Sequence, residues 1–271
     1  MTTPEATYDS YADDYRDWWG PVIAPPAIGL LDRLDGRLPA EATIVDIGAG
    51  TGTLSIGALK RWPAARVIGV DPSRRMLEIA EADASAAGLA DRLSVIVGDA
   101  ASLPLPDVSA DLAVTSFVLQ LIPNRVAAVR EAYRILRPGG TFACLIWRTD
   151  EDPFEPEDVL DDVLEDLRIP VPERKPGVGH SYTSPASAAA ELRRVGFREV
   201  EAREVWLEHR FTPESYVDVA EHWTEEDIFA PLDASTRHRL RTEVARRLAR
   251  LDPEVLLWRR PLVSVVGVRP G

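Results

Sequence analysis

The stretch TIVDIGAGTGT, residues 43–53, is the most informative part of the chain. It opens as a short apolar strand and then carries glycine at positions 48, 50 and 52, directly before a helix that we expect to begin near Leu54. Glycine lets a ligand lie against main-chain N–H groups, because no Cβ holds it away. The stretch therefore predicts a nucleotide-binding turn, and an ordinary strand-to-helix turn is the alternative on these residues alone.

The spacing of the glycines separates two kinds of nucleotide site. A dinucleotide-binding turn has its third glycine three residues after the second, which here is Thr53, whereas the chain has glycine one residue earlier. An NAD-dependent dehydrogenase is therefore disfavoured. The pattern Asp46-x-Gly48-x-Gly50-x-Gly52 instead resembles the first motif of the class I S-adenosylmethionine-dependent methyltransferases.

Later elements resemble the same family in the same order. Gly98-Asp99-Ala100 follows an apolar strand, and LRPGG at residues 136–140 precedes another, residues 141–147. The resemblance covers residues 43–147 closely, 185–207 moderately and 8–20 loosely. It implies an α/β fold with a Rossmann-like seven-stranded sheet in the order 3-2-1-4-5-7-6, strand 7 antiparallel, flanked by helices.

Acidic residues at strand ends are the main candidates for cofactor contacts. Asp71 ends the second strand, where a carboxylate can accept hydrogen bonds from both ribose hydroxyls, and Ser73 is the better helix cap. The resemblance places Asp99 at the adenine amino group, with a turn aspartate as the alternative. The predicted cofactor-binding residues are Tyr11, Tyr15, Asp46, Gly48, Ala49, Gly50, Gly52, Asp71, Pro72, Met76, Asp99, Ala100, Ser116, Phe117 and Gln120.

Segments outside the predicted sheet are expected to form the acceptor site. We expect one domain over residues 1–271, with a core of 36–148, 185–210 and 255–271 and lid segments 1–30, 149–184 and 211–254. The aromatic residues of 8–20 resemble a helix that folds over cofactor and substrate, and an amphipathic helix packed on the core is the alternative. Residues 21–26, with three prolines, are expected to interrupt the chain before a helix over 28–34.

Candidate catalytic bases are His180 and His222, one in each internal insertion, although a loop histidine is often structural. We expect orientation by the lid to matter more than either residue. Cys144 is the only cysteine and lies in an apolar run, which indicates a core residue. No metal site is predicted, because no His or Cys lies near the adjacent acids 161 and 162.

Composition limits the partners. A net charge of −13 argues against nucleic acid, and the arginine-rich segment 237–250 has an apolar stripe that indicates a packed helix. The first residues lack the features of a signal peptide, and no run approaches the roughly 18 apolar residues of a membrane span. We expect a cytoplasmic protein with no membrane insertion and a small-molecule substrate, and we keep a homodimer as a candidate assembly.

The function predicted from the motifs is methyl transfer from S-adenosylmethionine to a small, apolar or aromatic metabolite by in-line displacement, with S-adenosylhomocysteine as product. A protein of this fold that binds the same cofactor can instead catalyse a cyclase-like or hydroxylase-like reaction, or serve as a binding subunit. The acceptor atom stays open.

Overall fold

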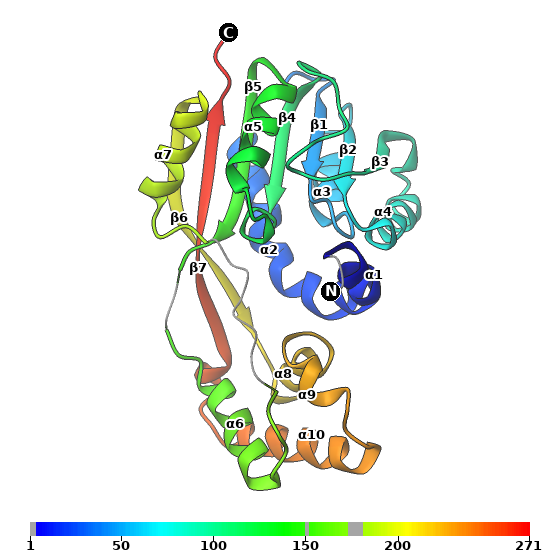
Figure 1. The fold of residues 1–271 in the computed structure, drawn as a ribbon, viewed down its shortest axis with the longest axis vertical. Helices are drawn as coiled ribbons and strands as arrows, with labels where there is room; N and C mark the ends of the chain where they lie inside the picture. Colours follow the sequence, from blue (N-terminus) through cyan, green and yellow to red (C-terminus); the bar gives the residue numbers. More distant parts are fainter. Residues whose placement is uncertain (1–3, 150–151, 173–180) are drawn as a thin grey trace.

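A seven-stranded sheet organises residues 4–149, 152–172 and 181–271, the parts of the chain that the computed structural model describes (Figure 1). The strands are β1 (Thr43–Ile47), β2 (Arg66–Asp71), β3 (Leu93–Val97), β4 (Ala110–Ser116), β5 (Leu136–Trp147), β6 (Arg198–Arg210) and β7 (Leu257–Val268). Their order is β3-β2-β1-β4-β5-β7-β6, and β7 runs antiparallel to both neighbours. The predicted fold class is confirmed, including the reversed strand.

Helices cover both faces of the sheet. They are α1 (Pro4–Asp14), α2 (Gly20–Leu31), α3 (Thr53–Arg61), α4 (Arg74–Ala86), α5 (Arg125–Ile135), α6 (Glu155–Leu167), α7 (Pro185–Val195), α8 (Pro213–Val219), α9 (Glu226–Phe229) and α10 (Ala234–Leu248), with two π-helical turns, η1 (Tyr15–Trp19) and η5 (Ala220–Thr224). None of these described helices combines the length and the apolar composition that crossing a bilayer would require.

Successive side chains of a strand point to opposite faces of the sheet, so the core has two layers, one on each face. Ile44 and Val114 face the layer that contains α2 and α3, whereas Val45 and Ala113 face the layer that contains α5 and α7. Cys144 lies in the second layer and is completely buried, as predicted. The parallel strands are apolar on both sides because helices cover both faces.

The expected interruption at residues 21–26 is wrong. The chain continues through them as α2, with Pro25 and Pro26 inside the helix. Two prolines remove backbone donors, but apolar side chains of α2, among them Ile23 and Leu30, are buried against the sheet. Burial of this face stabilises the helix by more than the missing hydrogen bonds cost. The expected helix over 28–34 is the end of α2 followed by a short 3₁₀ turn, Asp32–Leu34.

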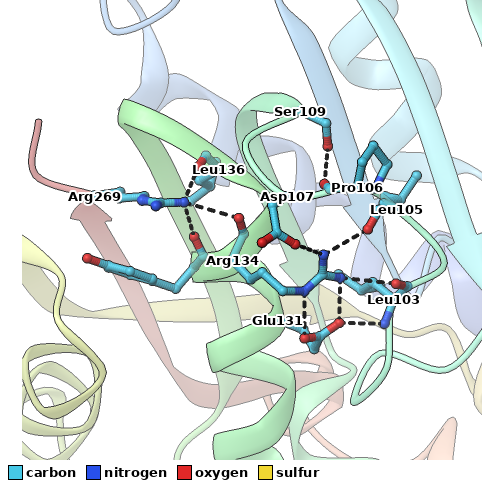
Figure 2. Close-up of polar contacts among 10 residues, drawn as sticks. Leu103, Leu105, Pro106, Asp107, Ser109, Glu131, Arg134, Leu136 and Arg269 are labelled. Carbon is cyan, nitrogen blue, oxygen red and sulfur yellow. Dashed lines mark hydrogen bonds and ion pairs between the residues drawn. The ribbon is translucent and has the colours of Figure 1, made fainter.

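Two arginines hold the loop between β3 and β4 and the end of α5 (Figure 2). The guanidinium of Arg134 donates to the carbonyls of Leu103 (3.1 Å) and Leu105 (2.8 Å) and pairs with Glu131 at 2.7 Å. Arg269, just after β7, donates to three carbonyls at the last turn of α5 and the start of β5, including that of Arg134 at 3.1 Å. The contacts of Arg269 with the Tyr133 and Arg134 carbonyls are made at a helix end, where carbonyls lack partners within the helix.

A long ribbon of β6 and β7 extends beyond the rest of the sheet. Pairing of β5 with β7 ends at Trp147↔Leu262, whereas β6 and β7 stay paired as far as Arg210↔Leu257. Figure 1 shows α6, α8, α9 and α10 gathered around the far end of this ribbon. The two insertions therefore meet, with α6 against α10. The predicted stripe on α10 is confirmed by Leu240, Val244 and Leu248, each at most 1% exposed.

Candidate functional site

A cavity of about 610 Å³ lies at the carboxyl ends of β1 to β4. The lining includes the residues that follow these strands, which is where open α/β sheets bind ligands. Of the predicted cofactor residues, those that line it are Tyr15, Gly48, Gly50, Asp71, Pro72, Met76, Asp99, Ala100, Ser116, Phe117 and Gln120. Tyr11, Asp46, Ala49 and Gly52 do not line it, and their role in binding stays a prediction.

The three glycines of the turn are required for different structural reasons. All three have positive φ, +74°, +52° and +84° in chain order. A Cβ on Gly48 would lie 2.3 Å from Val118, and a Cβ on Gly52 would lie 2.8 Å from Ala80, so both positions are needed for packing. A Cβ on Gly50 would meet nothing within 4 Å. Gly50 therefore leaves its backbone open to the cavity.

Asp71 connects the end of β2 to the glycine turn. Its carboxylate accepts hydrogen bonds from the N–H groups of Gly50 and Ser73, both at 2.9 Å, and the residue is 8% exposed. Burial raises the pKa of this carboxyl. Each oxygen has a further lone pair, so Asp71 can shape the turn and also accept from a ligand in the cavity. Ser73 caps α4 by accepting from the Met76 N–H, as predicted.

Asp46 lies behind the turn. Its carboxylate accepts from the Ser55 hydroxyl at 2.6 Å and is 1% exposed. Burial raises its pKa to about 7. Asp46 and Ala49 border a much smaller pocket, which shares Gly48 and Phe117 with the main cavity. Asp46 thus fixes the turn to α3 and does not face the main cavity.

Two features after β4 point to a ligand. Phe117 has φ +56°, a conformation that is costly for an aromatic residue and that tends to occur at functional sites. Gln120 donates from Nε2 to the Phe117 carbonyl at 2.6 Å, which leaves Oε1 buried without a partner among the described residues. A buried acceptor of this kind is expected to have a donor, and a ligand in the cavity can supply it.

Three tryptophans, Trp19, Trp147 and Trp223, also line the cavity, and we call them the aromatic wall. Trp19 and Trp223 have ring centroids 6.1 Å apart, and Trp258 stands against Trp19 (5.6 Å) and Trp147 (5.9 Å). The site prediction did not include these residues. Trp147 could have been found, because it ends strand β5, whereas nothing in the sequence brings Trp223 to the sheet.

The N-terminal segment contributes Tyr8, Tyr15 and Trp19 to the cavity lining. Asp9 accepts from the Ser73 hydroxyl at 2.5 Å, which attaches α1 to the start of α4, and Tyr11 donates to Glu226 at 3.2 Å, which attaches it to α9. Ala12 is fully buried against α4. Segment 8–20 therefore bridges the sheet domain and the second insertion, and its action as a lid stays a prediction.

Of the two histidine candidates, the structure describes only His222. His222 stacks on Trp18 with a centroid distance of 4.7 Å, and its Nδ1 lies 3.7 Å from the Asp14 carboxylate. It does not line the cavity. His180 lies outside the described residues. Among the residues that the structure describes, no histidine, lysine or arginine lines the cavity, and no residue of 149–184 does.

Comparison with known proteins agrees with this geometry. Residues 44–140 match the family model described as "Methyltransferase domain". A malonyl-[acyl-carrier protein] O-methyltransferase from Xylella fastidiosa is 40% identical over 123 residues, which are 44% of this chain and 39% of the relative. The ubiquinone/menaquinone biosynthesis C-methyltransferase UbiE from Dinoroseobacter shibae is 38% identical over 116 residues, 43% of this chain and 46% of the relative. The matches thus span less than half of these relatives.

Solved structures show the same fold at low sequence identity. The YcgJ protein from Bacillus subtilis has a TM-score of 0.59 at 21% identity, with 91% of this chain and 99% of that one covered. The [4+2]-cyclase SpnF has a TM-score of 0.57 at 21% identity and covers 90% of this chain and 81% of its own. The shared architecture is the sheet with its reversed strand.

Proposed function

We propose that this chain, which belongs to the class I S-adenosylmethionine-dependent methyltransferase family through its domain at residues 44–140, transfers a methyl group from S-adenosylmethionine to a small apolar or aromatic acceptor. The observation that carries the proposal is one cavity with two unlike kinds of lining. Open backbone and buried acceptors of hydrogen bonds lie at the strand ends, and the aromatic wall lines the same cavity.

The residues at the strand ends fit the cofactor. Gly50 leaves room for a ligand against the main chain. Each carboxylate oxygen of Asp71 accepts one hydrogen bond from the protein and can accept a second. The Oε1 atom of Gln120 has no donor among the described residues. S-adenosylmethionine has ribose hydroxyls and two amino groups that can supply donors. In our proposal Gly50 holds the methionine portion, Asp71 the ribose, and Asp99 with the Ala100 backbone the adenine.

When bound, S-adenosylmethionine would supply an activated methyl group on its sulfonium. The protein's part is to hold the acceptor in line and to exclude water. Correct orientation is worth roughly 7–11 kcal/mol, against about 3–5 kcal/mol for a general base. The aromatic and apolar residues of the cavity lining are suited to the first of these contributions.

One curated relative supports an apolar ring as acceptor, because its name refers to ubiquinone and menaquinone biosynthesis. The name of another refers to a malonyl group on a carrier protein, which is an acceptor of a different kind. A quinone ring is flat and apolar, and the aromatic wall offers flat apolar surfaces to such a ring.

Binding of the cofactor product tests the proposal. Calorimetric titration of S-adenosylhomocysteine is expected to show binding that Asp71→Ala weakens by about 2 kcal/mol or more, roughly 30-fold in Kd, because charge-assisted hydrogen bonds are lost. Asp91→Ala, an exposed aspartate outside the cavity, is the matched control and should leave Kd unchanged.

Methyl transfer itself needs a second measurement. Candidate acceptors incubated with S-adenosylmethionine and the protein are scanned by mass spectrometry for the gain of one methyl group. No binding of the product, or an unchanged Kd in Asp71→Ala, would contradict the cofactor assignment. Tight binding without any methylated product across a broad acceptor set would favour a non-methylating enzyme of this fold.

A further inference from the structure

We infer that the acceptor is a planar apolar molecule that carries no negative charge, and that Trp223 is the residue of the second insertion that selects it. This inference rests on the proposed function and adds the charge class of the acceptor. It depends on three features of the cavity: the charges in its lining, the polar groups among its aromatic residues, and the packing of Trp223.

The charged groups of the cavity have one sign. Asp71 and Asp99 are the charged side chains among its described lining residues, and both are acidic. Arginines nearby are paired with acids outside the cavity: Arg75 with Asp13 at 2.9 Å, and Arg260, which lies near Trp258, with Glu157 at 4.0 Å. Apart from the sulfonium of the cofactor itself, the described lining therefore offers no cation to a carboxylate or phosphate on the acceptor, and its charged side chains are acidic.

The phenol groups of the cavity, which lie near Asp71, suit a neutral partner. Tyr8 and Tyr15 line the cavity, and burial raises the pKa of both phenols, so each hydroxyl stays protonated at neutral pH. A phenol can donate one hydrogen bond, which fits a carbonyl or hydroxyl oxygen. Recognition of a buried anion commonly uses several charge-assisted donors, and two neutral phenols do not replace them.

Trp223 is held by other rings before any acceptor binds. It lies in the π-helical turn η5, edge-on to Tyr15 at 5.3 Å and nearly parallel to Trp19 at 6.1 Å. Tyr11 approaches it from α1 at 6.4 Å. A ring fixed in this way presents a rigid surface at small entropic cost, and the negative face of indole attracts neutral or cationic ligands more than anions.

The first experiment varies the charge on one ring system. 2-Naphthol, 2-naphthoate and 2-naphthyltrimethylammonium are titrated calorimetrically at neutral pH into the protein, both alone and saturated with S-adenosylhomocysteine. The neutral and cationic probes are expected to bind at least about 10-fold tighter than the carboxylate, because like charges repel at short range. Equal or tighter binding of 2-naphthoate would overturn the inference, and titration of the protein alone keeps this result available if the cofactor product does not bind.

The second experiment tests Trp223. Trp223→Ala is expected to weaken 2-naphthol binding by about 5-fold or more, the range of an aromatic pair together with its buried area, and Trp223→Phe should restore most of it. Trp206→Ala is the matched control, since Trp206 is an exposed tryptophan of β6 under the Arg259 guanidinium and outside the lining.

Affinity for S-adenosylhomocysteine separates the two proposals. It should stay unchanged in all three variants, because Trp223 belongs to the aromatic wall and not to the strand ends. Unchanged naphthol binding in Trp223→Ala, or an equal loss in Trp206→Ala, would refute the role of Trp223. Failure of the wild-type protein to bind S-adenosylhomocysteine would refute the cofactor assignment instead.

Discussion

Substitution of Gly50 by alanine tests whether this glycine faces the ligand or is needed only for its backbone conformation. Gly50 has φ +52°, so alanine there is strained in any case. The added Cβ would meet no protein atom within 4 Å and would project into the open space beside the turn. Gly88 has φ +71° and an equally open Cβ position, but it lies outside the cavity lining. Gly88→Ala is therefore a matched control for strain.

The two variants should lose similar stability and differ in binding. A left-handed conformation costs a non-glycine residue roughly 1–2 kcal/mol, which corresponds to a decrease in Tm of several degrees for a chain of this size. Carbon atoms in contact stand about 3.5–4.0 Å apart, so a methyl group between the main chain and the ligand forces the ligand away. We expect Gly50→Ala to weaken S-adenosylhomocysteine binding by about 10-fold or more, equivalent to about 1.4 kcal/mol.

The measurement combines calorimetric titration with thermal unfolding followed by circular dichroism. Gly88→Ala should show the shift in Tm without a change in Kd. The reasoning would be refuted if Gly50→Ala bound the ligand like the wild type, or if Gly88→Ala lost as much affinity, since strain alone would then explain the result.

Three further predictions concern pH, the N-terminal segment and one histidine. The pKa of Asp46 is about 7 in the folded protein against an ordinary value of 3.8, so its contribution to stability is present below pH 4 and is lost as pH rises through about 7. Urea unfolding at several pH values should show that Asp46→Asn abolishes this part of the pH dependence of the unfolding free energy. The same pH dependence in both proteins would contradict the prediction. Deletion of residues 1–20 removes Trp19 from the aromatic wall and should slow turnover on the identified acceptor by about 100-fold, equivalent to roughly 2.7 kcal/mol of barrier. Calorimetry should show that the truncated protein still binds S-adenosylhomocysteine, and full activity would rule out the lid. His222→Ala should lower kcat less than this deletion, because the ring stacks on Trp18 outside the cavity, and complete loss of turnover with unchanged Tm would identify His222 as catalytic.

Local sequence patterns located most strands, and the family resemblance supplied their order in the sheet. Apolar runs that end in glycine or aspartate indicate the carboxyl ends of parallel strands, and the resemblance pointed to Asp99. Both Asp71 and Asp99 line the cavity, and their contacts with a cofactor stay a prediction. The helix through Pro25 and Pro26 was missed because local propensity disfavours it and only burial against the sheet outweighs that preference. The aromatic wall was missed because its members come together through the packing of η1, β5 and η5.

The β6–β7 ribbon has a consequence for sequence comparison. It carries the helical cluster that supplies Trp223, and the other two members of the wall, Trp19 and Trp147, also lie outside the segment 44–140 that matches the family model. If the aromatic wall selects the acceptor as we propose, changes in these outer segments would alter the acceptor while residues 44–140 stay the same. Sequence likeness within 44–140 would then carry no information about the acceptor.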